Sequence, residues 1–194
     1  MQYDYKKKEI KIDKVLSNLD KFVIDFVSLL DEYVIVSGYV SILLGRTRAT
    51  EDVDLLIPKM TKSEFLILWN KIISKKYWCL NTPDIDEAFD LLEEHSIRFA
   101  KENEPVPNIE FKIIKNSLDQ FSYDNKIKIF FDSIFLYISP IELQVAYKLY
   151  LGTEKDIEDA RHIFRLFDEK INKVELLHSF EKLKLSANKI KLLK

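Results

Sequence analysis

The chain has 194 residues, of which 47% are hydrophobic and 32% charged, a composition that excludes disordered and collagen-like chains. Its formal net charge of -2 gives no overall preference for nucleic acid or for anionic membranes. The single cysteine, Cys79, cannot form an internal disulfide, so we expect a reducing, cytoplasmic environment. The N-terminal basic run precedes no apolar segment, and no apolar run reaches the length of a spanning helix; we therefore expect neither a signal peptide nor a membrane partner.

Hydrophobic periodicity predicts an α+β fold, with a mixed sheet flanked by helices. In chain order we expect a helix within 13–31, a strand at 34–36, a helix at 40–44, a strand at 53–57 and helices at 62–76 and 84–94. Then follow strands at 97–100 and 109–114 separated by a proline-containing loop at 101–108, a hairpin at 127–131 and 134–138, and helices at 141–151, 154–167, 174–183 and 187–193. We therefore expect an α+β domain over 1–138 and a helical region over 139–194. The strand at 34–36 should lie beside the strand at 53–57, with the helix after Gly38 packed on one face.

Local signals support several helix boundaries. Thr61 and Glu64 have the spacing of a capping box at the start of the helix at 62–76. Asp84 is a typical cap for the next helix. Pro140 stands where a proline is tolerated, at the first position of the helical region.

Glycine is scarce, with 3 residues where average usage predicts about 14. Two of them, Gly38 and Gly45, lie within one short segment. Gly38 stands where a short strand turns into a helix, and such a turn presents backbone N–H groups that suit a phosphate. The segment around Gly38 is therefore the first candidate for a functional site.

Two aspartates follow this turn. Asp52 and Asp54 are two residues apart on an expected strand, so both side chains leave the same face, while Val53 and Leu55 take the other. Two carboxylates in one space repel each other unless a cation lies between them, and oxygen ligands suit Mg²⁺ or Mn²⁺. A phosphate-binding turn beside such a pair is typical of metal-dependent phosphoryl or nucleotidyl transfer.

A third carboxylate is expected on a neighbouring strand, and Glu110 is the best-placed candidate. Ile109 and Phe111 take one face of that strand, which leaves Glu110 and Lys112 on the other. Two interpretations remain open: Glu110 is a metal ligand or general base, or it is an exposed carboxylate paired with Lys112.

These residues resemble a known pattern, that of the DNA polymerase β-like nucleotidyltransferases and, more closely, the AbiEii-type nucleotidyltransferase toxins. The resemblance rests on Ser37-Gly38-Tyr39, then Gly45, then Arg48-x-Thr50-x-Asp52-x-Asp54, and on Pro140-x-Glu142-Leu143, Lys148-Leu149 and Lys155-Asp156-x-x-Asp159. It implies a polymerase β-like fold, an NTP substrate, Mg²⁺ or Mn²⁺ held by Asp52, Asp54 and Glu110, and nucleotide contacts from Ser37, Gly38, Tyr39, Arg48, Thr50 and Lys148. Ser37 departs from the family, which has a first glycine there.

Several of these residues also have a structural interpretation. Arg48 either binds phosphate or pairs with Asp52 or Glu51. Lys148 either contacts the nucleotide or is a solvated lysine on a helix. Asp156 and Asp159 belong either to the family motif or to an ordinary charged helix face. Ser37 either contacts phosphate or simply caps the turn that follows it.

The sequence thus supports three functional hypotheses. The first is a transferase that moves a nucleoside monophosphate from an NTP to a hydroxyl of RNA or tRNA, a protein or a small molecule. The family resemblance adds that such an enzyme acts as a toxin with a cognate antitoxin partner. The second is a catalytically inactive module of the same fold that binds nucleotide, RNA or a partner protein. The third is an unrelated α+β regulatory domain.

Overall fold

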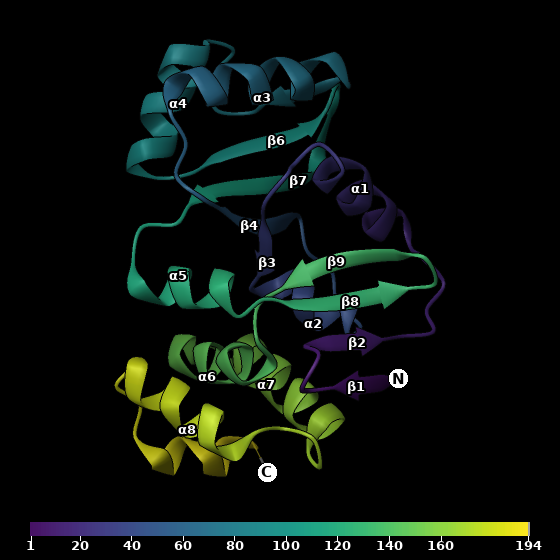
Figure 1. Ribbon diagram of the computed structural model, residues 1–194, viewed down its shortest axis with the longest axis vertical. Helices are drawn as coiled ribbons and strands as arrows, with labels where there is room; N and C mark the ends of the chain where they lie inside the picture. Colours follow the sequence, from purple (N-terminus) through teal and green to yellow (C-terminus); the bar gives the residue numbers. More distant parts are fainter. Residues whose placement is uncertain (194) are drawn as a thin grey trace.

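A computed structural model describes residues 1–193, and within this range nine strands form one mixed sheet, in the order β1-β2-β8-β9-β3-β4-β7-β6-β5 (Figure 1). The strands are β1 (Gln2–Asp4), β2 (Glu9–Lys11), β3 (Val34–Val36), β4 (Asp52–Ile57), β5 (Tyr77–Cys79), β6 (Ile97–Lys101), β7 (Glu104–Ile113), β8 (Ile127–Phe131) and β9 (Ile134–Ile138). The predicted α+β class with a mixed sheet is confirmed.

The centre of the sheet brings distant parts of the sequence into register. β3 runs antiparallel to β4, with Val36 opposite Asp54, and this confirms that the two strands are neighbours. β4 runs parallel to β7, with Asp54 opposite Glu110. Two acidic residues that are 56 positions apart therefore lie side by side on adjacent strands.

Helices surround this sheet, and those of the C-terminal part gather at one end of the molecule (Figure 1). They are α1 (Asn18–Val27), α2 (Gly38–Leu43), α3 (Lys62–Ser74), α4 (Ile85–Glu94), α5 (Ser117–Asp124), α6 (Ile141–Leu151), α7 (Glu154–Phe167), α8 (Lys173–Lys182) and the 3₁₀ helix η1 (Ala187–Leu193). α2 contacts β3, β4 and α7, so the helix after Gly38 packs on the sheet as predicted. Within residues 1–193, no helix combines the length and the apolar character needed to cross a bilayer.

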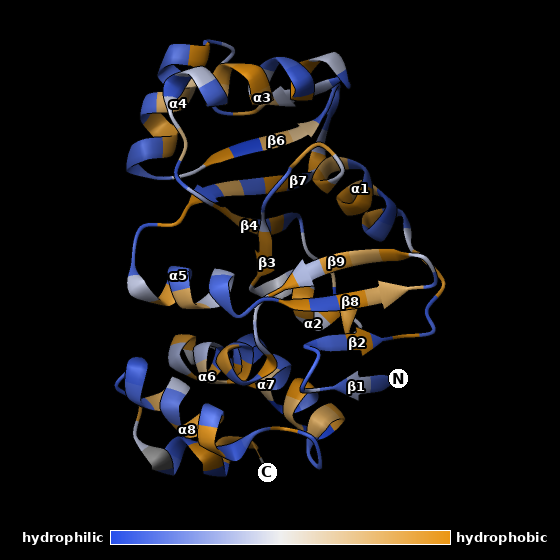
Figure 2. Cartoon of the chain, viewed as in Figure 1, coloured by the Kyte–Doolittle hydropathy of each residue, from blue (hydrophilic) through white to orange (hydrophobic). Residues whose placement is uncertain are grey.

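Alternation along the central strands separates two faces. Val53, Leu55 and Ile57 are buried in the main apolar core. Leu56 points to the other side and joins Val34 in a smaller buried cluster. In Figure 2, β3 is orange, whereas blue segments interrupt β7. The polar residues of β4 stand at its beginning. Asp52 and Asp54 therefore share the face of Leu56, opposite the core.

Several boundaries differ from the sequence-based expectation. The first helix starts only at Asn18, because Ser17 and Asp20 form a capping box there. The predicted loop at 101–108 is wrong: β6 and β7 form a hairpin, and β7 begins at Glu104. Both prolines lie before residue 108, where the β4 pairing of this strand starts, so neither interrupts that ladder. The α-helix expected at 187–193 is a 3₁₀ helix.

Candidate active site

A cavity of about 250 Å³ opens beside the carboxylate face of β4. The sheet contributes Asp54 and Lys112 to its lining, and the turn before α2 contributes Ser37. The opposite wall comes from α5 and α6, where Gln144 and Tyr147 are joined by leucine side chains. The sheet side of the cavity thus carries the ion pair of Asp54 and Lys112, the α6 side is mostly apolar, and α5 adds the polar side chains of Asp119 and Ser122.

Asp54, which lines this cavity, and Glu110 beside it on β7 are bridged by a lysine. Lys112 Nζ donates to Asp54 Oδ1 at 2.6 Å and lies 3.1 Å from Glu110 Oε2. Glu110 also accepts a hydrogen bond from Ser96 Oγ at 3.0 Å and lies 3.6 Å from the guanidinium of Arg98. The two acidic side chains are only 14% and 16% exposed, so their charges are poorly screened by water.

The pKa values of the pair diverge. Burial raises the pKa of Asp54 above its ordinary value, and the hydrogen bond with Glu110 adds to that rise against the opposing effect of Lys112. Burial also pushes the pKa of Glu110 upward, but hydrogen bonds with Asp54, Lys112 and Ser96 outweigh it and leave this pKa below its usual range. Lys112 has a raised pKa despite its burial, because it faces both carboxylates, and it carries a positive charge. The site is therefore built around one cation between two acids.

Asp52 shares the face of Asp54 but has a different partner. The hydroxyl of Thr50 donates to Asp52 Oδ1 at 3.2 Å and to the backbone oxygen of the same residue at 3.0 Å. In the part of the chain that the structure describes, no group of three acidic, histidine or cysteine side chains is close enough to hold a metal ion. The predicted third ligand, Glu110, lies beside Asp54, whereas Asp52 stands two residues earlier at the start of β4 and Thr50 precedes the strand.

The turn before α2 keeps a glycine-like backbone although its first residue is serine. Ser37 has φ 62° and ψ -133°, a conformation that L-residues rarely adopt, and its side chain makes no capping hydrogen bond. The nucleotidyltransferases that the sequence resembles have a glycine at this position, and glycine adopts such a backbone without strain. At Gly38, a Cβ atom would lie 2.4 Å from a guanidinium nitrogen of Arg48, so Arg48 packs directly against this residue.

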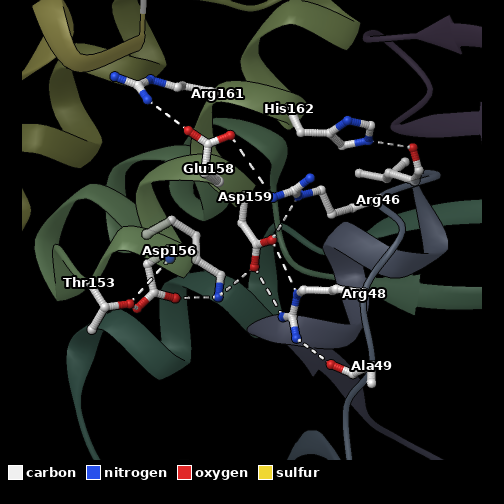
Figure 3. A network of polar contacts seen from close by, with 11 residues as sticks. Arg46, Arg48, Ala49, Thr153, Asp156, Glu158, Asp159, Arg161 and His162 are labelled. Atoms are coloured by element: carbon white, nitrogen blue, oxygen red, sulfur yellow. Dashed lines mark hydrogen bonds and ion pairs between the residues drawn. The ribbon is translucent and has the colours of Figure 1, made fainter.

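Arg48 and Lys148 belong to an ion cluster, shown in Figure 3, which we call the Asp159 cluster and define as Arg46, Arg48, Lys148, Asp156 and Asp159. Asp159 is fully buried and accepts two hydrogen bonds from Arg48, at 3.2 and 3.0 Å. Lys148 Nζ lies 3.2 Å from Asp159 and donates to Asp156 at 2.7 Å. Both cations are thereby directed at acids of α7, and neither lines the cavity.

Tyr39 lies away from the cavity as well. Its side chain is fully buried in the core, and its hydroxyl donates to Asp20 Oδ1 at 2.8 Å. Asp20 also receives hydrogen bonds from Lys14 and Ser17, so this tyrosine takes part in a buried polar network beneath α1. The structure gives Tyr39 a packing role rather than contact with a ligand in the cavity.

The helix side of the cavity was not expected from the sequence. Tyr147 and Gln144 lie on the inner surface of α6, and α5 as a whole was missing from the expected elements. The sequence does predict the position of Lys112, because this residue alternates with core residues along the strand and so shares a face with Glu110. No comparable signal marks Gln144, because nearly every residue of α6 is buried.

One solved structure supports the architecture. The fold is similar to that of an antigenic nucleotidyltransferase-like protein from Paracoccidioides brasiliensis, with a TM-score of 0.51 and 16% identity over 88% of each chain. The chain has a nucleotidyltransferase-like fold. No protein-family model matches the sequence, and no curated protein is significantly similar to it, so the AbiEii-type assignment stays a prediction.

Proposed function

We propose that this protein is a nucleotidyltransferase that transfers a nucleoside monophosphate from an NTP to a hydroxyl group. The observation that carries the proposal is the pairing of Asp54 with Glu110, in register on adjacent strands, with Asp54 lining a cavity to which Ser37 also contributes. The nucleotidyltransferase-like fold supports it. In this proposal the apolar wall of α6, with Tyr147, faces the nucleoside, and the triphosphate lies toward Lys112.

The carboxylates fit a divalent cation in chemical type, and Lys112 shows that the space between them accepts positive charge. Asp54 and Glu110 would hold Mg²⁺ or Mn²⁺, and Asp52, which does not form a three-acid group with them in this conformation, would join them only after its side chain moves. A bound Mg²⁺ would lower the pKa of the attacking hydroxyl and offset the charge on the leaving pyrophosphate. The chain itself positions the acids: Thr50 orients Asp52, and Ser96 orients Glu110.

The acceptor and the biological role follow only from the family resemblance. AbiEii-type toxins make RNA, such as a tRNA end, the first acceptor to test, and they make a cognate antitoxin protein a partner to look for. Proteins and small molecules with free hydroxyl groups come next.

A second function is favoured by specific contacts. Lys112 already neutralises Asp54 and Glu110, and Arg48 and Lys148 are engaged by Asp159. These contacts would serve a catalytically inactive module of the same fold that binds a nucleotide, an RNA or a partner protein. Such a module needs the cavity but not the carboxylates.

The test is a transfer assay with each α-labelled NTP, Mg²⁺ and total RNA. Asp52→Asn and Asp54→Asn should each reduce labelling by about 10²-fold or more, because an amide cannot replace the charge of a carboxylate in the site. The matched control is Asp90→Asn, an exposed aspartate on α4 that lies outside the cavity lining, and it should label RNA as the wild type does. Labelling that survives Asp54→Asn contradicts the proposal. NTP binding without any transfer supports the inactive module.

A further inference from the structure

Lys112 lines the cavity and contacts both of the acids that are proposed to bind a divalent cation. It stands two positions after Glu110 on β7, so both side chains point to the same face of the sheet. Its ammonium contacts one oxygen of each carboxylate, at 2.6 Å for Asp54 and 3.1 Å for Glu110. The three side chains form one compact unit between β4 and β7.

An ammonium and a divalent ion cannot share this position. Carboxylates bind Mg²⁺ at about 2.0–2.1 Å, so a metal that bridges Asp54 and Glu110 would lie in the space between them that the ammonium of Lys112 now occupies. Two cations held a few ångströms apart at a partly buried site would also repel each other strongly. Divalent metal can therefore reach both acids only after the lysine leaves.

The side chain of Lys112 has somewhere to go. It is 33% exposed and lines the cavity, and its four-carbon stem is flexible. Once released from the acids, its ammonium remains at the charged side of the cavity, where the proposed triphosphate lies.

We propose that Lys112 is a resident counter-ion that competes with divalent metal for Asp54 and Glu110 and is released toward the phosphates when a nucleotide binds. Metal affinity is then low in the absence of nucleotide and rises in its presence. This inference rests on the proposed function for the identity of the ligand, but its central claim concerns metal binding alone.

The test uses Mn²⁺ alone, titrated into the protein with free Mn²⁺ followed by electron paramagnetic resonance. Lys112→Met keeps the length of the side chain without its charge, and it should bind Mn²⁺ at least about tenfold more tightly than the wild type. Arg98→Met is the matched control, because Arg98 is a cation that faces Glu110 at 3.6 Å and has no contact with Asp54. It should change Mn²⁺ affinity by less than about threefold, since its exposed contact is weak.

Equal Mn²⁺ affinity in the wild type and Lys112→Met overturns the inference, and so does an absence of Mn²⁺ binding in both. If Lys112→Met is unfolded without metal, added Mn²⁺ should restore its cooperative melting transition; failure to do so also overturns the inference. The transfer assay is independent of this result. Absence of transfer by the wild type, together with tighter Mn²⁺ binding in Lys112→Met, would count against the proposed function alone.

Discussion

Asp159→Asn should be among the most destabilising single substitutions in this protein. The carboxylate is fully buried, accepts two hydrogen bonds from Arg48 and forms an ion pair with Lys148. Asparagine keeps the shape but removes the charge. Lys148 retains Asp156, whereas Arg48 keeps a hydrogen bond to the backbone oxygen of Ala49 and loses its carboxylate partner.

Removing one partner of a buried ion pair typically costs about 3–5 kcal/mol. We expect about 3 kcal/mol here, at the lower end, because Arg48 remains 11% exposed and the partner of Lys148 is kept. Urea unfolding followed by circular dichroism measures the change. The matched control is Glu158→Gln on the same helix, whose side chain is 43% exposed and pairs with Arg161; it should cost less than about 1 kcal/mol.

If Asp159→Asn lowers the free energy of unfolding by less than about 1 kcal/mol, this reasoning is refuted, because the ion pair of Asp159 with Arg48 would then contribute little to stability. A double-mutant cycle with Arg48→Met sharpens the result. The coupling energy should be about 1–3 kcal/mol, since the two side chains contact each other directly.

Two other predictions concern backbone strain and pH. Ser37→Gly should stabilise the fold by about 1 kcal/mol, because the relief of a strained positive φ exceeds the cost of a more flexible unfolded chain. The change should appear as a higher urea midpoint, and a lower midpoint would contradict the assignment of strain. Burial raises the pKa of Asp20, but hydrogen bonds from Lys14, Ser17 and Tyr39 outweigh burial and hold this pKa below its usual value. The ionised Asp20 therefore stabilises the fold fully above about pH 4, and this stabilisation is lost as the pH falls through the lowered pKa of the folded state. Asp20→Asn should therefore flatten the acid side of a plot of unfolding free energy against pH, and an unchanged slope would contradict this.

The sequence predicts the centre of the molecule well. β3, β4, α3 and the hairpin of β8 and β9 all form where periodicity and capping place them, because each signal is local. The strands β1 and β2 carry no such signal: each is three residues long, β1 pairs with β2, and β2 pairs with β8, which lies more than a hundred residues away. Tertiary contacts decide these elements, and a local pattern cannot reveal them.

The same distinction applies to the site. The spacing of Asp52 and Asp54 predicts a shared face from strand geometry alone, and the alternation around Glu110 predicts the face that it shares with Lys112. The approach of Asp54 and Glu110 depends on the parallel pairing of β4 with β7, which the sequence does not specify. The ion pairs of Arg48 with Asp159 join residues 111 positions apart, so motif spacing could not distinguish a nucleotide contact from a structural one.

The strand order also sets a sequence of events during synthesis. β3, β4, β7, β6 and β5 are neighbours in the sheet and are all complete once residue 113 has emerged, so this half can pair early. β1 and β2 are made first but must wait for β8, which ends at Phe131, before the register of Ile10 with Ile129 can form. The carboxylate pair is thus assembled within the early half, whereas α6 closes the cavity only after Leu151 has been added. A nascent chain arrested after Ile113 but before Ile127 would display Asp54 and Glu110 on an open sheet, with β2 still without its partner strand β8.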